Sequence, residues 1–438
     1  MKTAWYFALV AAICFEGMGR KFMPQVPSFV FYFLKDVILL IGYLGFRRPK
    51  LVGQTTTWLY RGFKTAWVIG FAWTVVELFN PEHASMLMGA VGMRAYWVWW
   101  AAPPLIASVL DNEKEKRRAI YALLVAAAAV SIFAAVQFAL PSTASLNAYA
   151  PIEGEDIQTA TVHSTGRSRV ASTFSFVSGF ADFTVLVPTL ILALGLDARD
   201  PKLRKSALVV TGLTAAVVPM SGARASVLLG GAVLIISAWS AGLLFTRIGR
   251  RIVAGSVVAG VLAVAVFPDA FFGVQTRFEN NEETQGRYVQ MASSIVPPLA
   301  MATFEYPAFG FGTGMMQNAR QMLHIPAKME VEAEPGRYLA ELGPIGFLLI
   351  WSTKLGLVVA LIRAYRILKR AGRRGASAAA LSYAFLTMWG SLAFDHIWQA
   401  LYFLGCGLIL AEVVSVLRAR AAAASAVPPP PEKALIAA

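Results

Sequence analysis

The stretch that decides the fold is KEKRRAIYALLVAAAAVSIFAAVQFAL, from Lys114 to Leu140. Its apolar part, residues 119–140, contains no charged side chain. As a helix, this part is long enough to cross the roughly 30 Å hydrocarbon core of a bilayer. The five residues before it are all charged and four of them are basic. Because basic residues are retained on the cytoplasmic side of short loops, the stretch predicts a transmembrane helix that starts in the cytoplasm.

The same pattern repeats along the chain. Of the 438 residues, 57% are hydrophobic and only 15% are charged, with a mean hydropathy of +0.59. This composition excludes a soluble domain of that length. We therefore predict an all-α integral membrane protein with about twelve transmembrane helices. Their windows are residues 4–16, 28–46, 65–79, 87–110, 119–140, 171–196, 206–220, 225–246, 252–268, 344–362, 377–393 and 397–417.

The basic residues fix the predicted orientation, because nearly every second loop is rich in Lys and Arg. We place these loops in the cytoplasm together with both termini: residues 47–64, 114–118, 199–205, 247–251 and 363–374. The loops at 141–170 and 269–340 then face outward, the second of them between the ninth and tenth helices. Residues 1–417 form one membrane domain, and residues 418–438 are predicted to be a disordered cytoplasmic tail. Arg20 and Lys21 are the exception to the alternation.

Several classes of function have little support in the composition. The net charge of +14 could indicate nucleic-acid binding, but most Lys and Arg residues lie in the predicted cytoplasmic loops, where topology explains them. Cys14 and Cys406 both lie in predicted helices, so a disulfide is not expected. The four histidines are scattered and form no metal-binding pair. We expect no nucleic acid, no metal and no cofactor.

The outer loop at 269–340 is the region in which we expect function, because long loops in compact proteins are usually functional. Its charged residues include Arg277, Arg287, Arg320, Arg337, Glu330, Glu332 and Glu334. The run Pro307-Ala-Phe-Gly-Phe-Gly-Thr-Gly314 predicts a turn. Two interpretations of that turn stay open. It is a plain connector, or its backbone N–H groups bind a phosphate.

Two arginines at outer helix ends pose a similar choice. Arg224 follows Ser221-Gly-Ala at the start of one predicted helix, and Arg94 lies near the outer end of another. Each is either an interface residue that reaches toward the head groups or part of an anion site. Lys35 and Asp36 lie inside the second predicted helix, and we interpret them as an internal ion pair.

Four short motifs, in this order, resemble those of the bacterial O-antigen ligase and polymerase superfamily. They are Ser221-Gly-x-Arg224, Gly286-Arg287, Pro307-x-x-Gly-x-Gly312 and Glu341-x-Gly-x-x-Gly346. With about twelve predicted helices, the resemblance covers most of the chain. The family it points to consists of membrane glycosyltransferases that take glycans from undecaprenyl-diphosphate carriers at the outer face of the inner membrane.

The resemblance implies that Arg224 and Arg287 bind the diphosphate of the lipid-linked donor. Arg94, Arg169 and Arg337 are secondary candidates for the same anionic site. Guanidinium groups can neutralise a leaving diphosphate without proton transfer. Family members are similar in needing no metal, and this chain has no convincing Asp-x-Asp motif to hold one.

The chain differs from the family at the position of the residues that activate the acceptor hydroxyl. Ligases usually carry a His-Asn pair about nine residues before the Glu-x-Gly motif, and that position is Glu332 here, with Glu334 two residues later. Either carboxylate is a candidate general base. Pro335 favours an extended chain, in which both would face the same side. The departure favours a polymerase, which transfers lipid-linked repeat units onto a glycan acceptor, over a ligase that acts on lipid A-core.

Two further expectations concern a protein partner and an alternative class of function. A chain-length regulator is an expected partner of a polymerase. A lipid-glycan flippase or secondary transporter is the alternative of another class, because twelve helices also suit that architecture. Against it, the two halves of the chain show no obvious repeat, and the charges gather outside rather than at mid-membrane.

Overall fold

The computed structural model describes residues 2–46, 53–150, 161, 166–198, 200–242, 264–279, 307–317, 320, 323–326, 331 and 334–425. Within these ranges the chain is helical, and its only β-type pairing is an isolated bridge between Thr161 and Ser168. The predicted all-α class is confirmed for this part of the chain.

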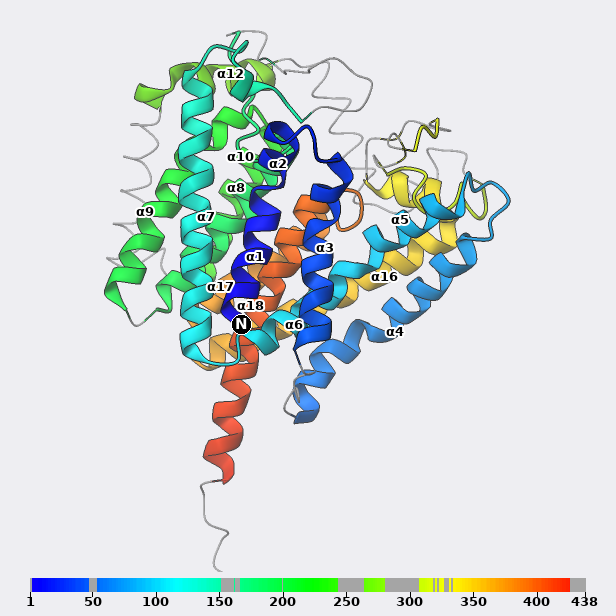
Figure 1. Ribbon diagram of the computed structural model, residues 1–438. Coiled ribbons are helices and arrows are strands. Elements are labelled where there is room, and N and C mark those ends of the chain that lie inside the picture. The colour runs from blue at the N-terminus through cyan, green and yellow to red at the C-terminus, as the bar shows by residue number, and fades with distance from the viewer. Residues whose placement is uncertain are drawn as a thin grey trace, which may run out of the picture.

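The described helices follow one another along the chain as Figure 1 shows. They are α1 (Lys2–Cys14), α2 (Glu16–Phe22), α3 (Ser28–Gly45), α4 (Gly53–Glu77), α5 (Met86–Trp97), η1 (Val98–Ala101), α6 (Ala102–Val109), α7 (Glu113–Ala139), η2 (Ser145–Asn147), α8 (Val177–Leu196), α9 (Pro201–Val217), η3 (Val218–Ser221), α10 (Arg224–Ser240), α12 (Pro268–Glu279), α16 (Glu334–Arg370), α17 (Arg374–Trp389) and α18 (His396–Ser425).

Six segments of the described chain are long and apolar enough to cross a membrane: α3, α7, α8, the Pro201–Ser221 segment, α16 and α18. Helices α1 and α10 are apolar but shorter. The predicted number of about twelve stays a prediction. Residues 252–263 of the window at 252–268 lie outside the described residues, as does the middle of the predicted outer loop.

One predicted helix is wrong as a single element. The window 87–110 is divided into α5, the 3₁₀ turn η1 and α6. Pro103 and Pro104 explain the break, because proline has no N–H to donate and its ring clashes with the preceding turn. Both prolines lie in the first turn of α6, where a missing N–H costs nothing.

Helix starts elsewhere follow ordinary capping chemistry. Asn112 precedes α7 and its side-chain oxygen accepts the Glu115 N–H at 2.9 Å. Asp200 precedes α9 and accepts the Lys202 N–H at 2.9 Å, with Pro201 as the first helical residue. These short polar side chains satisfy donors that the first helical turn leaves without a partner.

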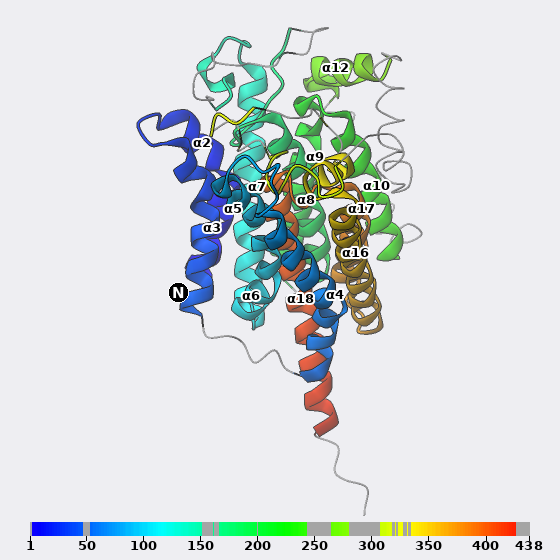
Figure 2. The ribbon, with the colours of Figure 1, turned by 90° about the vertical axis from the view of Figure 1, so that its right-hand side faces the viewer.

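Helix α18 lies at the centre of the bundle and contacts α6, α8, α16 and α17. Of its apolar window, 78% is buried, against 17% for α3, which lies at the periphery. Helices α4 and α16 pack side by side on one flank (Figures 1 and 2). On the other flank, α9 packs against α7 and α8, and α10 packs against α8 and α17. The core is therefore built around the last helix of the chain.

Ion pairs and a hydrogen bond join several segments of the chain at one end of the bundle. At one end, Lys2 pairs with Asp111 at 3.0 Å, and Arg418 near the end of α18 donates to the Asp111 carbonyl at 3.3 Å. Arg117 pairs with Asp200 there at 2.8 Å. The start of α1, the part of α18 around Arg418 and the predicted basic loops around Arg117 and Asp200 thus lie together. Helices α2 and α12 lie at the opposite end, which we call the α2 end (Figure 1).

The predicted boundary of the tail needs a correction. Helix α18 continues to Ser425, so the first part of the predicted disordered tail at 418–438 is helical. Residues 419–424 are five alanines and one arginine, and alanine has the highest helix propensity. Residues 426–438 lie outside the described part of the chain.

Candidate functional site

Two of the predicted anion-binding residues are brought together by a turn at the α2 end. Arg169 donates its Nε–H to the Ser221 carbonyl at 3.2 Å, and the neighbouring Val170 N–H bonds the Met220 carbonyl at 3.0 Å. Gly222 has a φ of 61°, a left-handed conformation that turns the chain into α10. Arg224 is the first residue of α10. The predicted motif therefore places Arg224 at a helix N-terminus, with Arg169 against the turn that precedes it.

Helix α2 packs on the chain segment that follows Arg169. Arg20 donates to the Ser175 hydroxyl at 3.1 Å, and Lys21 donates to the Ser172 carbonyl at 3.3 Å. Burial lowers the pKa of Lys21 to about 8. A methyl group on Gly17 would lie 2.0 Å from the Phe174 carbonyl carbon, so no larger residue fits there. These contacts explain why Arg20 and Lys21 are exceptions to the alternation of basic loops. The two side chains hold α2 against the segment that follows Arg169.

The same helix carries a buried acid that the sequence analysis did not single out. One carboxylate oxygen of Glu16 accepts a hydrogen bond from the Lys35 ammonium at 2.5 Å. The other oxygen lies 3.0 Å from Nε2 of His396. The side chains of Glu16 and Lys35 are 1% and 0% exposed, whereas that of His396 is 26% exposed. We call the residues of this region the charged layer: Glu16, Arg20, Lys21, Lys35, Arg169, Arg224 and His396.

Glu334, one of the two predicted bases, opens α16 close to the charged layer. Gly343 breaks the helix at a φ of 64°, and the segment before it folds back, so that Glu334 reaches Lys354 at 3.4 Å. The same carboxylate accepts the Leu392 N–H at 2.9 Å and a hydrogen bond from the Tyr338 hydroxyl. Its oxygens are thus committed to three donors.

The expected extended conformation at Glu334 is wrong. Pro335 occupies the first turn of α16, which tolerates proline. Glu332, the other predicted base, lies outside the described residues, as does Arg287.

Arg337 contacts the turn that leads into α18. Its Nε–H donates to the Val331 carbonyl at 2.8 Å, and its guanidinium lies 5.6 Å from the centre of the Phe394 ring. The next residue, Asp395, accepts the N–H groups of Ile397 and Trp398 at 3.0 and 3.1 Å, in the first turn of α18. Glu334 and Arg337 therefore both contact the turn between α17 and α18, directly before His396.

The predicted glycine turn is confirmed, but its backbone donors are occupied. The Gly310 N–H bonds the Pro307 carbonyl at 2.9 Å, and the Gly312 N–H bonds the Glu341 carbonyl at 3.0 Å. Gly314 is hydrogen-bonded through its backbone to the Glu341 carboxylate. Since these N–H groups have protein partners, the turn is a structural connector and its glycine N–H groups are not available for a phosphate.

Glu341 holds this turn from inside the protein. Its side chain is fully buried. The carboxylate accepts hydrogen bonds from the Met316 N–H at 2.5 Å and from the Tyr96 hydroxyl at 2.8 Å. The motifs Pro307-x-x-Gly-x-Gly312 and Glu341-x-Gly-x-x-Gly346, far apart in the sequence, are thus packed together. We call Glu341, Tyr96 and the turn at 307–317 the Glu341 clamp.

Arg94, another predicted anion-binding residue, has a protein partner. Its Nε–H donates to Asp36 at 2.7 Å, and its guanidinium lies between the Tyr32 and Phe33 rings, 4.6 and 4.9 Å from their centres. Lys35 pairs with Glu16, as described above. Lys35 and Asp36 are thus both ion-paired inside the fold, but with other residues rather than with each other.

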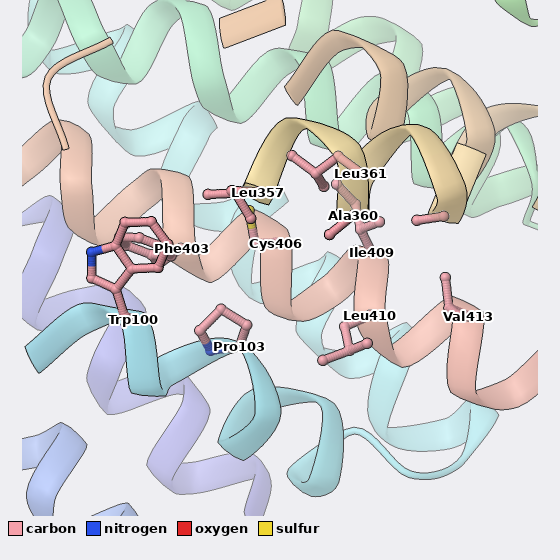
Figure 3. A pocket seen from close by; sticks show the side chains of 11 residues that line it. Trp100, Pro103, Leu357, Ala360, Leu361, Phe403, Cys406, Ile409, Leu410 and Val413 are labelled. Carbon is pink, nitrogen blue, oxygen red and sulfur yellow. The ribbon is translucent and has the colours of Figure 1, made fainter. Parts of the chain in front are cut away.

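A separate cavity of about 60 Å³ lies between α6, α16 and α18 (Figure 3). Its lining is apolar and includes Trp100, Pro103, Leu361, Phe403 and Cys406. It contains no pair of acid and base, so it suits a hydrocarbon chain rather than a reaction.

No protein-family model matches the chain, and no curated protein matches it in sequence. A function for the protein therefore rests on its motifs and on the geometry of the α2 end.

Proposed function

We propose that the protein is a membrane glycosyltransferase that polymerises or transfers oligosaccharide repeat units carried on undecaprenyl diphosphate. The observation that carries this proposal is the charged layer, in which arginines, a buried acid and a histidine gather at one end of an apolar helical bundle. Ionisable groups cost free energy at a membrane boundary and are commonly kept for function.

The proposed reaction is a single displacement with inversion at the anomeric carbon. An acceptor sugar hydroxyl attacks that carbon, and the diphosphate leaves with the electron pair of the broken C–O bond. Arg224 and Arg287 bind the diphosphate and neutralise its growing charge, so that no metal is required. Arg224 at a helix N-terminus adds its charge to the positive end of the helix dipole.

Of the secondary candidates, Arg169 fits this role best because it lies against the turn before Arg224. Arg337 contacts the turn before His396 and stays a secondary candidate for the anionic site. Arg94 is paired with Asp36, which supports a structural role for it.

The proposed topology follows the alternation of basic loops. About twelve helices span the bacterial inner membrane, both termini lie in the cytoplasm, and the α2 end faces outward. Supporting this orientation, Lys2 near the start of the chain and Arg418 of α18 both contact Asp111, at the end of the bundle opposite α2. The donor is a lipid-linked glycan, the acceptor is a second glycan, and a chain-length regulator is the expected partner.

The test uses the purified protein in liposomes with lipid-linked repeat units extracted from bacterial membranes. We expect longer lipid-linked glycans on a gel, and no product without protein. Addition of lipid A-core tests the ligase alternative, since transfer to that acceptor alone would replace polymerisation. Movement of the lipid-linked glycan across the bilayer without any covalent change would contradict the proposal and support a flippase.

A further inference from the structure

His396 and His83 both make hydrogen bonds through the ring, but among the described residues only one ring nitrogen of His396 has a partner. Its Nε2 lies 3.0 Å from the Glu16 carboxylate, and its ring lies 4.6 Å from that of Tyr32. His83, by contrast, has both nitrogens engaged: Nε2 with the Thr313 carbonyl at 2.8 Å and Nδ1 with the Ser85 N–H at 3.3 Å. His83 is therefore a structural histidine.

The partner of Nε2 decides the chemistry of the other nitrogen. A carboxylate only accepts hydrogen bonds, so in the neutral ring Nε2 carries the proton and Nδ1 keeps its lone pair. The carboxylate and its ammonium partner are almost fully buried, whereas the imidazole is 26% exposed. The imidazole is thus the accessible part of a fixed acid–histidine pair, as a general base requires.

The surroundings of His396 connect it to the predicted site. The turn before it contacts Glu334 and Arg337. The helix that carries Glu16 also carries Arg20 and Lys21, which contact the segment beginning at Arg169. His396 is therefore connected through α2 to the segment that begins at Arg169, and through the turn before it to Glu334 and Arg337.

We propose that His396 is the general base that activates the acceptor sugar. This inference rests on the proposed function and deepens it. The acceptor hydroxyl gives its proton to Nδ1 of His396, its oxygen bonds to the anomeric carbon, and the C–O bond to the diphosphate breaks. Glu16 then stabilises the imidazolium, which releases its proton to water.

The assignment explains why the predicted position 332 needs no histidine in this chain. Glu334 is a weaker candidate on geometry, because Lys354, Leu392 and Tyr338 already donate to its carboxylate. In this chain, His396 at the start of α18 would take the role that the outer-loop histidine has in ligases of the family.

The decisive variant is His396→Gln. The glutamine amide N–H₂ can keep the hydrogen bond from the Nε2 position to Glu16, but it has no basic nitrogen. We expect chain extension to fall about 100-fold or more, with binding of undecaprenyl diphosphate and the melting temperature close to the parental values. The matched control is His324→Gln, at an exposed position outside the charged layer, which should stay fully active.

Each result decides between the inference and the proposed function. If the parental protein extends no glycan, the proposed function fails. If the parental protein is active and His396→Gln stays within about threefold of it, only the assignment of His396 is overturned. If His396→Gln melts at a clearly lower temperature, His396→Ala with added imidazole decides. Restored extension supports a base at this position, and no restoration shows a structural histidine.

Discussion

The Glu341 clamp and the charged layer lie in the same protein and use similar residue types, but they differ in what their polar groups contact. In the clamp, the Glu341 carboxylate is fully buried and its oxygens accept Met316 N–H and the Tyr96 hydroxyl. In the charged layer, the imidazole of His396 is partly exposed beyond its contact with Glu16. Groups bonded only to the protein build the fold, whereas a fixed group with an open side can meet a substrate.

This difference separates two kinds of mutational effect. Changes in the clamp should lower the amount of folded protein and leave the turnover of each folded molecule unchanged. Changes at Arg224 and His396, within the charged layer, should lower turnover and leave folding unchanged. The predictions below test that separation, beginning with the largest effect.

Glu341→Ala should cause the largest loss, in stability. It leaves the Met316 N–H and the Tyr96 hydroxyl buried without an acceptor. Each such group costs about 1–3 kcal/mol and the cavity adds to it, so we expect a loss of roughly 3–5 kcal/mol. Thermal unfolding in detergent measures it. Glu341→Gln keeps one oxygen acceptor and should lose less. A parental melting temperature for Glu341→Ala would show that the clamp does not hold the fold.

Arg224→Ala should cause the next largest loss, in turnover. Removing one guanidinium from a charged leaving group typically costs about 100- to 1,000-fold in rate, and the fold should remain intact. Arg224→Lys should keep only part of the parental rate, because a point charge cannot form two parallel hydrogen bonds to the diphosphate. Arg287→Ala should behave alike. Chain extension at matched protein levels gives the readout.

The control for the arginine variants is Arg420→Ala, an exposed arginine near the far end of α18. It should extend glycan at the parental rate. Near-normal product length in Arg224→Ala would remove this residue from the diphosphate site and weaken the proposed function of the whole charged layer.

The sequence predicted most of the helical architecture, because apolar length alone indicates a membrane helix. It failed where local chemistry overrides hydropathy. Pro103 and Pro104 break one predicted helix, and Pro335 is accommodated in a first turn, so α16 begins at Glu334. The alanine-rich end of α18 carries Arg418 and Arg420, whose charges end a hydropathy window, yet alanine favours helix strongly.

The candidate site was predicted only where its parts are close in the sequence. Ser221 to Arg224 formed a recognisable motif, and the turn is present. Glu16 and His396, 380 residues apart, could be joined only by the fold. An ionisable residue at the edge of a predicted helix was the available signal for both. The glycine turn was predicted, but only the fold could decide between its two interpretations, because a sequence cannot show that backbone donors already have partners.

Glu334→Gln should have a smaller effect, mainly on stability. The change removes the charge that faces Lys354, whose side chain is 3% exposed, but keeps an acceptor for the Leu392 N–H. We expect a loss of about 1–3 kcal/mol and little change in turnover per folded molecule. Glu412→Gln is the matched control, since Glu412 forms a similar buried pair with Lys116 at 2.9 Å.

The opposite pattern for Glu334→Gln, an unchanged melting temperature with lost extension, would assign the role of base to Glu334 and contradict the role of His396. Glu332→Gln and the double variant complete this test. If all three extend glycan at the parental rate, neither predicted carboxylate is the base.

A chelator should have no effect. Among the described residues, no three His, Cys, Asp or Glu side chains gather to hold a metal ion. In the proposed mechanism, Arg224 and Arg287 neutralise the leaving diphosphate, the role that a divalent ion has in many enzymes that transfer phosphate-linked groups. Their charge does not depend on a bound ion. Chain extension in excess EDTA should therefore equal that in its absence, with a magnesium-dependent glycosyltransferase as the positive control for chelation. Activity that disappears in EDTA and returns with magnesium or manganese would show that the arginines are not sufficient, and that the charged layer binds the donor together with a metal.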